Sequence, residues 1–414
     1  MSDQPLSHTQ WLSRLNDHLK NERYASGSAT HCVAVARVFL AFLEKQHIKL
    51  RSIQPAHVEK YLQYALRRFR RRCGHLPAYR EWRSAQTAPI HMLLRLAHGQ
   101  WPPDSQPATQ AERSHHRICE QYVRWMVDIR GLAPATVSDR RMEVRRFLAW
   151  LRTSRTEVAA LKIADVDRYL KERASSLHRS SINTVSGWLR VFLRWLHSTG
   201  QTNRDLSTAV IGPSMYAFAS VPSALRSQDV KKVLDAARRD STPSGIRDYA
   251  ILMLFARYGI RAGEAASLRL DDFDWRNGVI RVCHSKTDSA SYLPLLPEVG
   301  NAVLKYLQKA RPKTAFRQVF IRDRAPYRPF ENGVSLYSIV RRWVDAAGVV
   351  TSGRRGPHAF RHARAVSMLR ARVPLKEIGD VLGHRSTTST MTYLKLATED
   401  LRAIALEVPV GVQA

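Results

Sequence analysis

An internal repeat constrains the possible fold of this sequence more than any other feature. At a constant offset of 108, residues 37–62 align without gaps with residues 145–170, and nine of the 26 pairs are identical. The identities include most of the block FLAFL at 39–43 against FLAWL at 147–151, and they continue beyond a loop into a second helical pattern. Two unrelated amphipathic helices could share a short block by chance. A common register across helix, loop and helix favours duplication of one small helical domain.

Both copies have helical periodicity. Val144, Phe147, Leu148 and Leu151 fall at i, i+3, i+4 and i+7, which places them on one face of a 3.6-residue helix. A further helix is predicted over residues 180–197, with apolar and basic side chains on opposite faces.

Two composition breaks divide the chain. Residues 100–107 (QWPPDSQP) cannot continue a helix, because proline lacks the N–H and its ring clashes with the preceding turn. Residues 201–224 contain proline, glycine and small polar residues and are predicted to form a linker. We therefore expect three domains, at residues 1–100, 108–205 and 223–414.

The third segment mixes helix and strand. An apolar helix is predicted over 248–257, and strands over 279–282 and 292–295 form a hairpin around a turn that contains Lys286. Helical patterns follow at 298–310, 335–347, 362–372 and 375–382. The expected fold is mainly α, with two all-α modules before an α+β domain that has a small antiparallel sheet.

The net charge indicates a polyanionic partner. The 414 residues include 66 Lys+Arg against 35 Asp+Glu, a formal charge of +31, and 52 of the 66 cations are arginine. An enzyme acting on small anions needs a basic pocket and not a basic body, so a small-molecule substrate is not expected. A polyanion is the expected partner, with nucleic acid ahead of the membrane surface. The longest uncharged apolar run, 249–256, is too short for a membrane span, which takes ~20 residues. The four cysteines lie far apart, so neither a zinc site nor a disulfide framework is expected, and a reducing cytoplasm fits.

Basic helix faces provide candidates for DNA contact. The alternative for each arginine is a merely solvated face, but basic faces repeated in both modules favour phosphate contact. The densest run is RRFRRR at 67–72, whose alternative is a solvated basic loop. The DNA-binding candidates are Arg67, Arg68, Thr136, Arg140, Arg141, Ser181 and Arg190.

A second group of residues suits phosphodiester chemistry. Two guanidiniums and an imidazole can hold the charge that develops on an attacked phosphate, a tyrosine hydroxyl can attack it, and a lysine or histidine can protonate the leaving oxygen. Taken singly, each residue has an ordinary explanation, such as the surface ion pair that Arg261 could form with Glu264 three residues later. The set is Arg261, Lys286, His358, Arg361, His384 and Tyr393, with Glu264 in support.

Other catalytic motifs do not occur in the sequence. It contains neither a Gly-Lys dipeptide of a P-loop nor a His-Glu-x-x-His zinc motif. Asp271, Asp272 and Asp274 could suggest a two-metal nuclease, but acidic clusters between a helix and a strand are more often turn and capping residues. We therefore expect neither a metal nor a cofactor.

The predicted catalytic residues and their sequence neighbours resemble motifs of the tyrosine site-specific recombinases, the phage-integrase family. The resemblance rests on YGIRAGE at 258–264, His-x-x-Arg-His at 358–362, Leu-Gly-His at 382–384, and Tyr393 nine residues after His384. It covers residues 226–400, and residues 112–205 resemble the family's helical core-binding domain. The resemblance implies two SAM-like DNA-binding modules followed by a tyrosine-recombinase catalytic domain.

The resemblance also implies roles for the residues. Tyr393 would form a 3′-phosphotyrosine link, Arg261 and Arg361 would clamp the phosphate, and Lys286 would be the general acid. His358 and His384 would assist proton transfer, and Glu264 would support Arg261. Lys286 stands in SKTD (285–288), whereas many family members have a glycine-rich hairpin there.

The resemblance further implies double-stranded DNA as the partner, bound by a homotetramer or by an assembly with partner recombinases, in the integration, excision or transposition of a mobile element. The second helical module is more like the recombinases of transposons and of recombinase-in-trio elements than like arm-binding integrases. Three alternatives remain at this point: a type IB topoisomerase, a non-catalytic DNA-binding regulator of recombinase descent, and a metal-dependent transposase.

Overall fold

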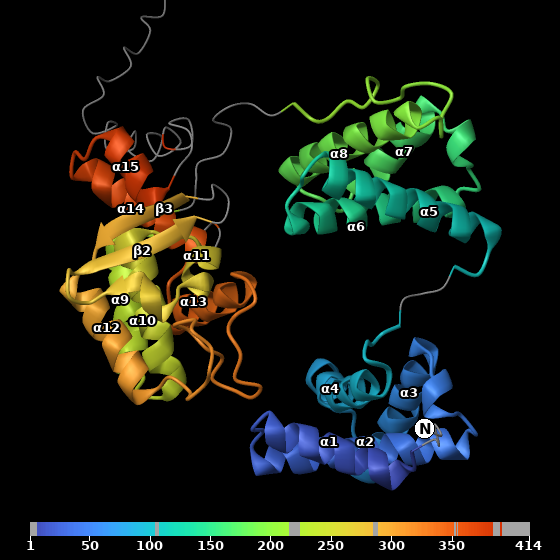
Figure 1. The fold of residues 1–414 in the computed structure, drawn as a ribbon, viewed down its shortest axis with the longest axis horizontal. Helices are drawn as coiled ribbons and strands as arrows, with labels where there is room; N and C mark the ends of the chain where they lie inside the picture. Colours follow the sequence, from blue (N-terminus) through green and yellow to red (C-terminus); the bar gives the residue numbers. More distant parts are fainter. Residues whose placement is uncertain are drawn as a thin grey trace, which may run out of the picture. The chain divides into compact units, whose positions relative to one another are not determined.

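The computed structural model describes residues 6–103, 107–214, 224–284, 289–351, 353, 355–383 and 390. Within these residues the chain is mainly helical and has one three-stranded antiparallel sheet, so the predicted fold class is confirmed (Figure 1). The chain packs as two compact units, residues 1–103 together with 220–414, and residues 104–219. Each unit is described by itself below.

The N-terminal helices have a hydrophobic core of their own. Their bounds are α1 His8–Asn21, α2 Ser26–Lys45, the 3₁₀ turn η1 Leu50–Ser52, α3 Pro55–Cys73 and α4 Tyr79–His98. In the described part of the chain, α2 is the one helix long and apolar enough to match a membrane span by composition. Its side chains Phe39, Leu40 and Leu43 are buried in the core that α2 shares with α1, α3 and α4.

Residues 104–219 form a second helical bundle. Its elements are α5 Gln110–Arg124, a π-helical turn η2 Trp125–Ile129, α6 Pro134–Thr153, the 3₁₀ turn η3 Val158–Ala160, α7 Ile163–Ala174 and α8 Arg179–Ser198. Phe147, Leu151 and Leu196 are fully buried in its core, on the faces that the periodicity predicts.

The two helical bundles share one register. Helices α2 and α6 begin and end at an offset of 108, the turns η1 and η3 do the same, and α3 and α7 begin at that offset. A T-shaped ring pair recurs in each bundle: Phe39 with Tyr61, and Phe147 with Tyr169, both with centroids 5.0 Å apart. The sequence repeat is thus also a repeat of secondary structure and of core packing, which is what the duplication hypothesis predicts.

The C-terminal part is built around a buried helix. Its helices are α9 Ser227–Arg239, α10 Pro243–Tyr258, α11 Ala262–Ser267, the 3₁₀ turn η4 Leu270–Asp272, α12 Pro297–Lys309, α13 Val334–Ala346, α14 Pro357–Arg370 and α15 Leu375–Leu382. Helix α10 packs against α9, α12 and α14 (Figure 1). Eleven of the 16 residues of α10 are buried, including Ile251, Leu254 and Phe255, because the run from Tyr249 to Ala256 places apolar side chains on every face. The position of α10 therefore sets the positions of the surrounding elements.

The small sheet follows the predicted hairpin and adds a strand. Strand β2 Val279–His284 pairs antiparallel with β3 Ser289–Pro294, with Val279 opposite Pro294 and His284 opposite Ser289. The two-residue strand β1 Phe273–Asp274 joins the other edge of β2 and was not predicted. Strand β3 also begins three residues earlier than predicted, because the polar segment SAS (289–291) pairs with β2 although it lacks an apolar alternation.

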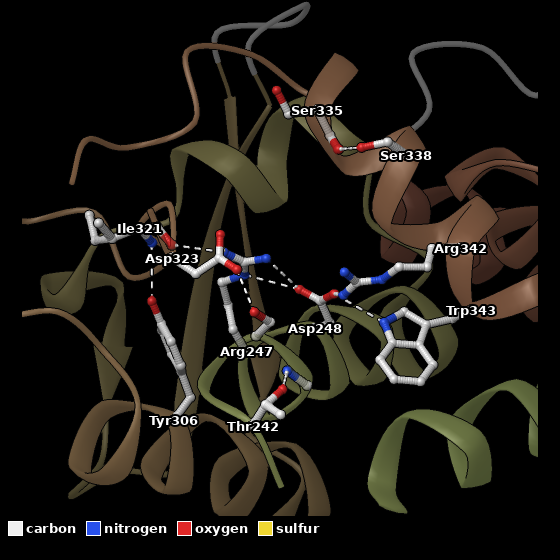
Figure 2. Close-up of polar contacts among 12 residues, drawn as sticks. Thr242, Arg247, Asp248, Tyr306, Ile321, Asp323, Ser335, Ser338, Arg342 and Trp343 are labelled. Atoms are coloured by element: carbon white, nitrogen blue, oxygen red, sulfur yellow. Dashed lines mark hydrogen bonds and ion pairs between the residues drawn. The ribbon is translucent and has the colours of Figure 1, made fainter. Parts of the chain in front are cut away.

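A buried carboxylate fixes the start of α10. Asp248 is fully buried and accepts hydrogen bonds from Arg247 Nε at 3.0 Å and from Trp343 Nε1 at 3.0 Å. It also pairs with Arg342 of α13 (Figure 2). Because a buried charge must be paired, this network holds α13 against α10.

A second carboxylate extends the network to the loop before α13. Arg247 NH1 lies 3.0 Å from Asp323 Oδ1, and the Ser244 hydroxyl also donates to Asp323 (Figure 2). Burial alone would raise the pKa of Asp323, but the hydrogen bond from Ser244 and the charge of Arg247 lower it to about 2. Two acids and two arginines thus anchor α10, whose other end leads into the candidate site.

Candidate active site

Arg261 lies where α10 turns into α11. Gly259 ends α10 in the left-handed conformation with φ +64°, and Arg261 is the N-cap of α11. Its backbone N–H donates to Glu264 Oε2 at 2.7 Å, and its NH1 donates to Glu264 Oε1 at 2.6 Å. About a quarter of the Arg261 side chain stays exposed, at 24%. The pairing expected from the i, i+3 spacing is present, and it leaves the guanidinium partly accessible.

Glu264 is the buried anchor of this group. It is 3% exposed, and its Oε1 also lies 2.8 Å from His284 Nδ1. Burial by itself would raise the pKa of Glu264, but hydrogen bonds with His284 and Arg261 hold it below its usual value. Glu264 therefore stays ionised and fixes the plane of the Arg261 guanidinium.

His284 is a site residue that the sequence analysis did not single out. It is the last residue of β2 and 3% exposed, and its Nε2 lies 2.8 Å from Ser291 Oγ on β3. The available signal was the alternation of Ile280, Val282 and His284, which places a histidine on the buried face of the strand. A buried polar side chain at the end of an apolar face calls for a partner, and Glu264 is that partner.

Arg361 is almost completely buried on α14. It is 3% exposed; its NH1 donates to the Gly259 carbonyl at 2.9 Å, and its NH2 donates to the Leu382 carbonyl. One guanidinium thus holds the end of α10 and the end of α15 together. This contact orders the backbone on both sides of the site.

Both arginines meet at the C-terminus of α15. Arg261 NH2 donates to the Gly383 carbonyl at 3.0 Å, next to the Leu382 carbonyl that Arg361 holds. Carbonyls at a helix C-terminus lack helical partners and carry the negative end of the dipole, so cations are favoured there. Gly383 has φ +63°, and a Cβ at this position would lie 2.4 Å from His284 Cε1. Glycine is required here for both its backbone conformation and its size.

His358 lies in the first turn of α14, one turn before Arg361. It is exposed, and its ring centroid is 6.3 Å from that of Tyr337 and 6.2 Å from that of His362. Helix α14 begins at Pro357, five residues before the predicted pattern at 362, because proline is well accommodated in a first turn. The earlier start is what places His358 and Arg361 on one helix.

Three predicted catalytic residues, Lys286, His384 and Tyr393, lie outside the described residues. Their sequence neighbours in the structure belong to the site: His284 comes two residues before Lys286, and Gly383 immediately precedes His384. The structure therefore brings together Arg261, Glu264 and Arg361, with His358 on the same helix as Arg361.

The acidic cluster after α11 has structural contacts. Asp272 Oδ2 accepts from the Arg269 N–H at 2.8 Å, and Asp272 Oδ1 lies 2.7 Å from Arg281 NH2. Asp274 Oδ1 accepts the Asn277 N–H at 2.9 Å, and Asp271 pairs with Arg317. Across the residues that the structure describes, no group of three or more His, Cys, Asp or Glu side chains is arranged to hold a metal.

Two of the DNA-binding candidates on the second helical bundle have polar contacts within that bundle. Arg141 NH2 pairs with Glu120 Oε1 at 2.7 Å, and its side chain is 42% exposed. Arg190 NH2 donates to the Val210 carbonyl at 2.8 Å, and Arg140 is half-buried. Arg190 therefore also holds the segment that follows α8.

Three of the other candidates are exposed. Arg67 and Arg68 are exposed on α3, and the nearest acceptor of Arg67 Nε is the Gln63 carbonyl at 3.4 Å. Ser181 is exposed in the first turn of α8, and Thr136 is half-buried in the first turn of α6. Contact of all seven candidates with DNA remains a prediction.

Comparisons with known proteins identify the family. Residues 223–400 match the phage integrase family, and residues 119–200 match the phage integrase N-terminal SAM-like domain. The integrase/recombinase y4rA of Sinorhizobium fredii is 34% identical over 399 residues, which cover 94% of this chain and 92% of that protein. The chain belongs to the phage integrase family of tyrosine recombinases. Members of this family cleave and rejoin DNA, which argues against a non-catalytic regulator. The relatives are integrases and recombinases, which favours recombination over the topoisomerase alternative.

Other relatives agree with this membership. The integrase/recombinase y4gC of the same organism is 56% identical over 189 residues, covering 46% of this chain and 97% of that protein. Among solved structures, the XerH recombinase bound to difH has a TM-score of 0.55 at 15% identity, covering 73% of this chain and 90% of that chain. The Tn1549 transposon integrase has a TM-score of 0.52 at 17% identity, covering 69% of this chain and 99% of that chain. These structural likenesses show a shared fold.

Proposed function

We propose that this tyrosine recombinase is a site-specific enzyme of a mobile element, which integrates, excises or transposes DNA through a 3′-phosphotyrosine formed on Tyr393. The observation that supports the proposal most directly is the convergence of Arg261 and Arg361 on the C-terminus of α15, the helix that leads into His384. Similarity to y4rA along almost the whole chain supports a recombinase role that involves all parts of this chain.

In the proposed mechanism the arginines stabilise the charge of the attacked phosphate. Arg261 keeps an accessible edge, so it is the better placed of the two to bind the non-bridging oxygens directly. Arg361 lies beneath the turn at Leu382 and Gly383, where a buried cation acts with little screening. Glu264, ionised and held by His284, prevents Arg261 from turning away.

The proposed chemistry conserves the energy of the phosphodiester bond. The Tyr393 oxygen bonds to phosphorus and gives up its proton, with His358 or His384 assisting, while the bond from phosphorus to the 5′ oxygen breaks. Lys286 protonates that oxygen as it leaves. The free 5′-hydroxyl of a second strand then attacks the phosphotyrosine in the reverse step. Because the covalent link retains the energy of the broken bond, religation needs no ATP.

The proposed assembly follows the family. Residues 108–205 would contact duplex DNA as a SAM-like core-binding domain, and residues 1–100 would do so as a second such module. Two duplexes would be joined by a homotetramer, or by this chain together with partner recombinases. Action on DNA in the cytoplasm fits this function.

A nicked suicide substrate carrying the element ends tests the proposal. The short fragment that bears the free 5′-hydroxyl diffuses away after cleavage, so religation is blocked and a recombinase accumulates as a covalent protein–DNA adduct. We expect the adduct with the wild-type chain, also in EDTA, and none with Tyr393→Phe. An adduct that survives Tyr393→Phe would refute the assignment of the nucleophile, and loss of the adduct in EDTA would indicate metal-dependent chemistry.

A further inference from the structure

A basic groove lies on the N-terminal bundle, in the part of the chain that precedes both family matches. Its volume is about 550 Å³, and helices α2 and α3 form its walls. Four cations and two aromatic rings line it: Lys60, Arg67, Arg68, Arg71, Phe42 and Tyr64. We refer to it as the basic groove.

The cations follow one face of α3. Lys60, Tyr64, Arg67 and Arg71 recur at i, i+4, i+7 and i+11, with Arg68 beside them. The row extends about 16 Å along the helix at 1.5 Å per residue. Charges on one DNA strand recur every ~3.4 Å along the helix axis, so this row can face more than one phosphate.

The groove contains positive charge without its own counter-charge. In the part of the chain that the structure describes, no carboxylate lies within ion-pairing distance of these four cations; the nearby Glu59 is paired with Arg83 instead. Like charges at i, i+4 destabilise a helix. The negative end of the helix dipole at the α3 C-terminus offsets this repulsion only in part, and only for the arginines of the last turn. An anion in the groove would remove this repulsion.

The second bundle shows the same site in a neutralised form. At the offset of 108, Trp150 corresponds to Phe42, Arg168 to Lys60 and Glu172 to Tyr64. Trp150 Nε1 donates to Glu172 Oε2 at 2.7 Å, and the Arg168 guanidinium lies 5.3 Å from the Trp150 ring. Arg168 is also paired with Asp165 at 2.5 Å.

The N-terminal bundle differs from the second in two ways that increase its charge. Tyr64 stands where the second bundle has Glu172, and His57 stands where it has Asp165, the carboxylate that pairs with Arg168, so neither carboxylate has a counterpart beside Lys60. Helix α7 ends at Ala174, which corresponds to position 66, whereas α3 continues to Cys73. The additional turns bear the arginine run at 67–72.

We propose that the basic groove binds the phosphate backbone of the duplex DNA on which the enzyme acts, as a contact made by the N-terminal bundle alone. Lysine, arginine, glutamine and tyrosine are residue types that contact DNA phosphates and position a protein without reading bases. This inference rests on the proposed function, because it takes duplex DNA as the substrate.

Salt dependence of DNA binding tests the proposal in the full chain. Each phosphate contact contributes about 0.9 to the slope of log K against log salt concentration. We expect the double variant Arg68→Gln/Arg71→Gln to reduce that slope by about 2. The matched control is Arg37→Gln/Arg80→Gln, which removes the same charge from exposed arginines of the same bundle that do not line the groove. An unchanged slope in the groove variant, or an equal reduction in the control, would refute the proposal.

A second pair of variants tests the comparison between the bundles. Tyr64→Glu supplies the groove with the carboxylate that Glu172 supplies in the second bundle, and Tyr64→Gln changes the side chain without adding charge. We expect the glutamate variant to bind duplex DNA several-fold more weakly than the glutamine variant, with equal thermal stability of the two. Equal affinities would show that the groove does not contact DNA.

The two proposals fail in distinguishable ways. If the wild-type chain forms the covalent adduct but the groove variant keeps the full salt slope, the proposed recombinase function stands and the groove proposal is refuted. If the groove variant shows the reduced slope but the wild-type chain forms no adduct, the groove proposal stands and the proposed recombinase function is refuted. Groove-dependent binding that is stronger for duplex RNA or for anionic vesicles than for duplex DNA would overturn the choice of ligand.

Discussion

At the scale of the residue, the two site arginines have different environments. Arg261 is partly exposed and bonded to Glu264, whereas Arg361 is 3% exposed and bonded to two backbone carbonyls. Five N–H donors in a rigid planar fork let one guanidinium hold several acceptors in fixed directions, whereas the ammonium of lysine is a compact point charge with three donors. The same residue type therefore has a partly accessible guanidinium in one case and a buried guanidinium that ties two backbone segments together in the other.

We expect Arg261→Ala and Arg361→Ala to reduce cleavage in different ways. Loss of either cation should slow adduct formation by about 10²–10³-fold, the usual cost of removing one group that stabilises transition-state charge. Arg361→Ala should in addition destabilise the fold by about 1–3 kcal/mol, because it leaves buried carbonyls unpaired. Single-turnover cleavage of the nicked substrate and thermal unfolding separate the two effects. Equal destabilisation by both variants would contradict this assignment.

At the scale of the element, the turn after α15 positions the site. Gly383 combines a positive φ with close contact to the His284 ring, and both features follow from the way α15 ends against β2. Gly278, in the hairpin between β1 and β2, has φ +64° and no heavy atom within 4 Å of a built Cβ. The two glycines thus share backbone strain but not crowding.

This difference predicts the outcome of two alanine substitutions. Gly383→Ala and Gly278→Ala should each cost about 1–2 kcal/mol of stability through the left-handed conformation. We expect only Gly383→Ala to slow cleavage, by about 10²-fold, because a shift of the backbone that Arg261 and Arg361 hold misplaces the reacting groups. Adduct kinetics of the two variants check this. A loss of the same size in Gly278→Ala would show that strain, and not crowding at the site, is responsible.

The network at the start of α10 predicts a dependence of stability on pH. The folded-state pKa of Asp323, about 2, lies below the ordinary value of 3.8, so its contribution is complete above about pH 4 and is lost as the pH falls toward 2. The Asp323 side chain is 28% exposed. We expect Asp323→Asn to lower the free energy of unfolding by about 2 kcal/mol at neutral pH and by almost nothing near pH 2. Hydrogen exchange of α10 and α13 amides measures the difference. A cost that is independent of pH would exclude the ionic contribution.

At the scale of the whole molecule, separate cores support a modular organisation. The N-terminal bundle, the second bundle and the region around α10 each bury their own cluster of apolar side chains. Residues 1–103 nevertheless pack in one compact unit with residues 220–414. Whether the three predicted domains act independently is therefore an experimental question.

Deletion of residues 1–107 answers that question. We expect the remaining chain to stay folded, because its two cores are complete, and to bind DNA more weakly with a smaller salt slope. Circular dichroism with thermal unfolding measures the first property, and binding at several salt concentrations measures the second. Unfolding of the remainder would show that the N-terminal bundle is a structural part of the catalytic unit.

The sequence by itself determined the elements with strong periodicity. The faces of α2 and α6, the apolar stretch 248–257 of α10 and the exact bounds of α15 follow from spacing and from the end signal at Gly383. The i, i+3 spacing of Arg261 and Glu264 also predicted their pairing, because residues three apart share a helix face. Local rules suffice where both partners lie on one element.

Only the tertiary structure decided the contacts between distant segments. No local pattern places His284 against Glu264, Arg361 against Gly259, or Asp248 against Trp343, since these pairs are 20, 102 and 95 residues apart in the chain. Nor could the sequence distinguish the unpaired cations of the basic groove from a paired cation such as Arg168, because pairing depends on which carboxylate the fold brings near. Burial and the pairing of charges arise from packing, and packing is a property of the assembled chain.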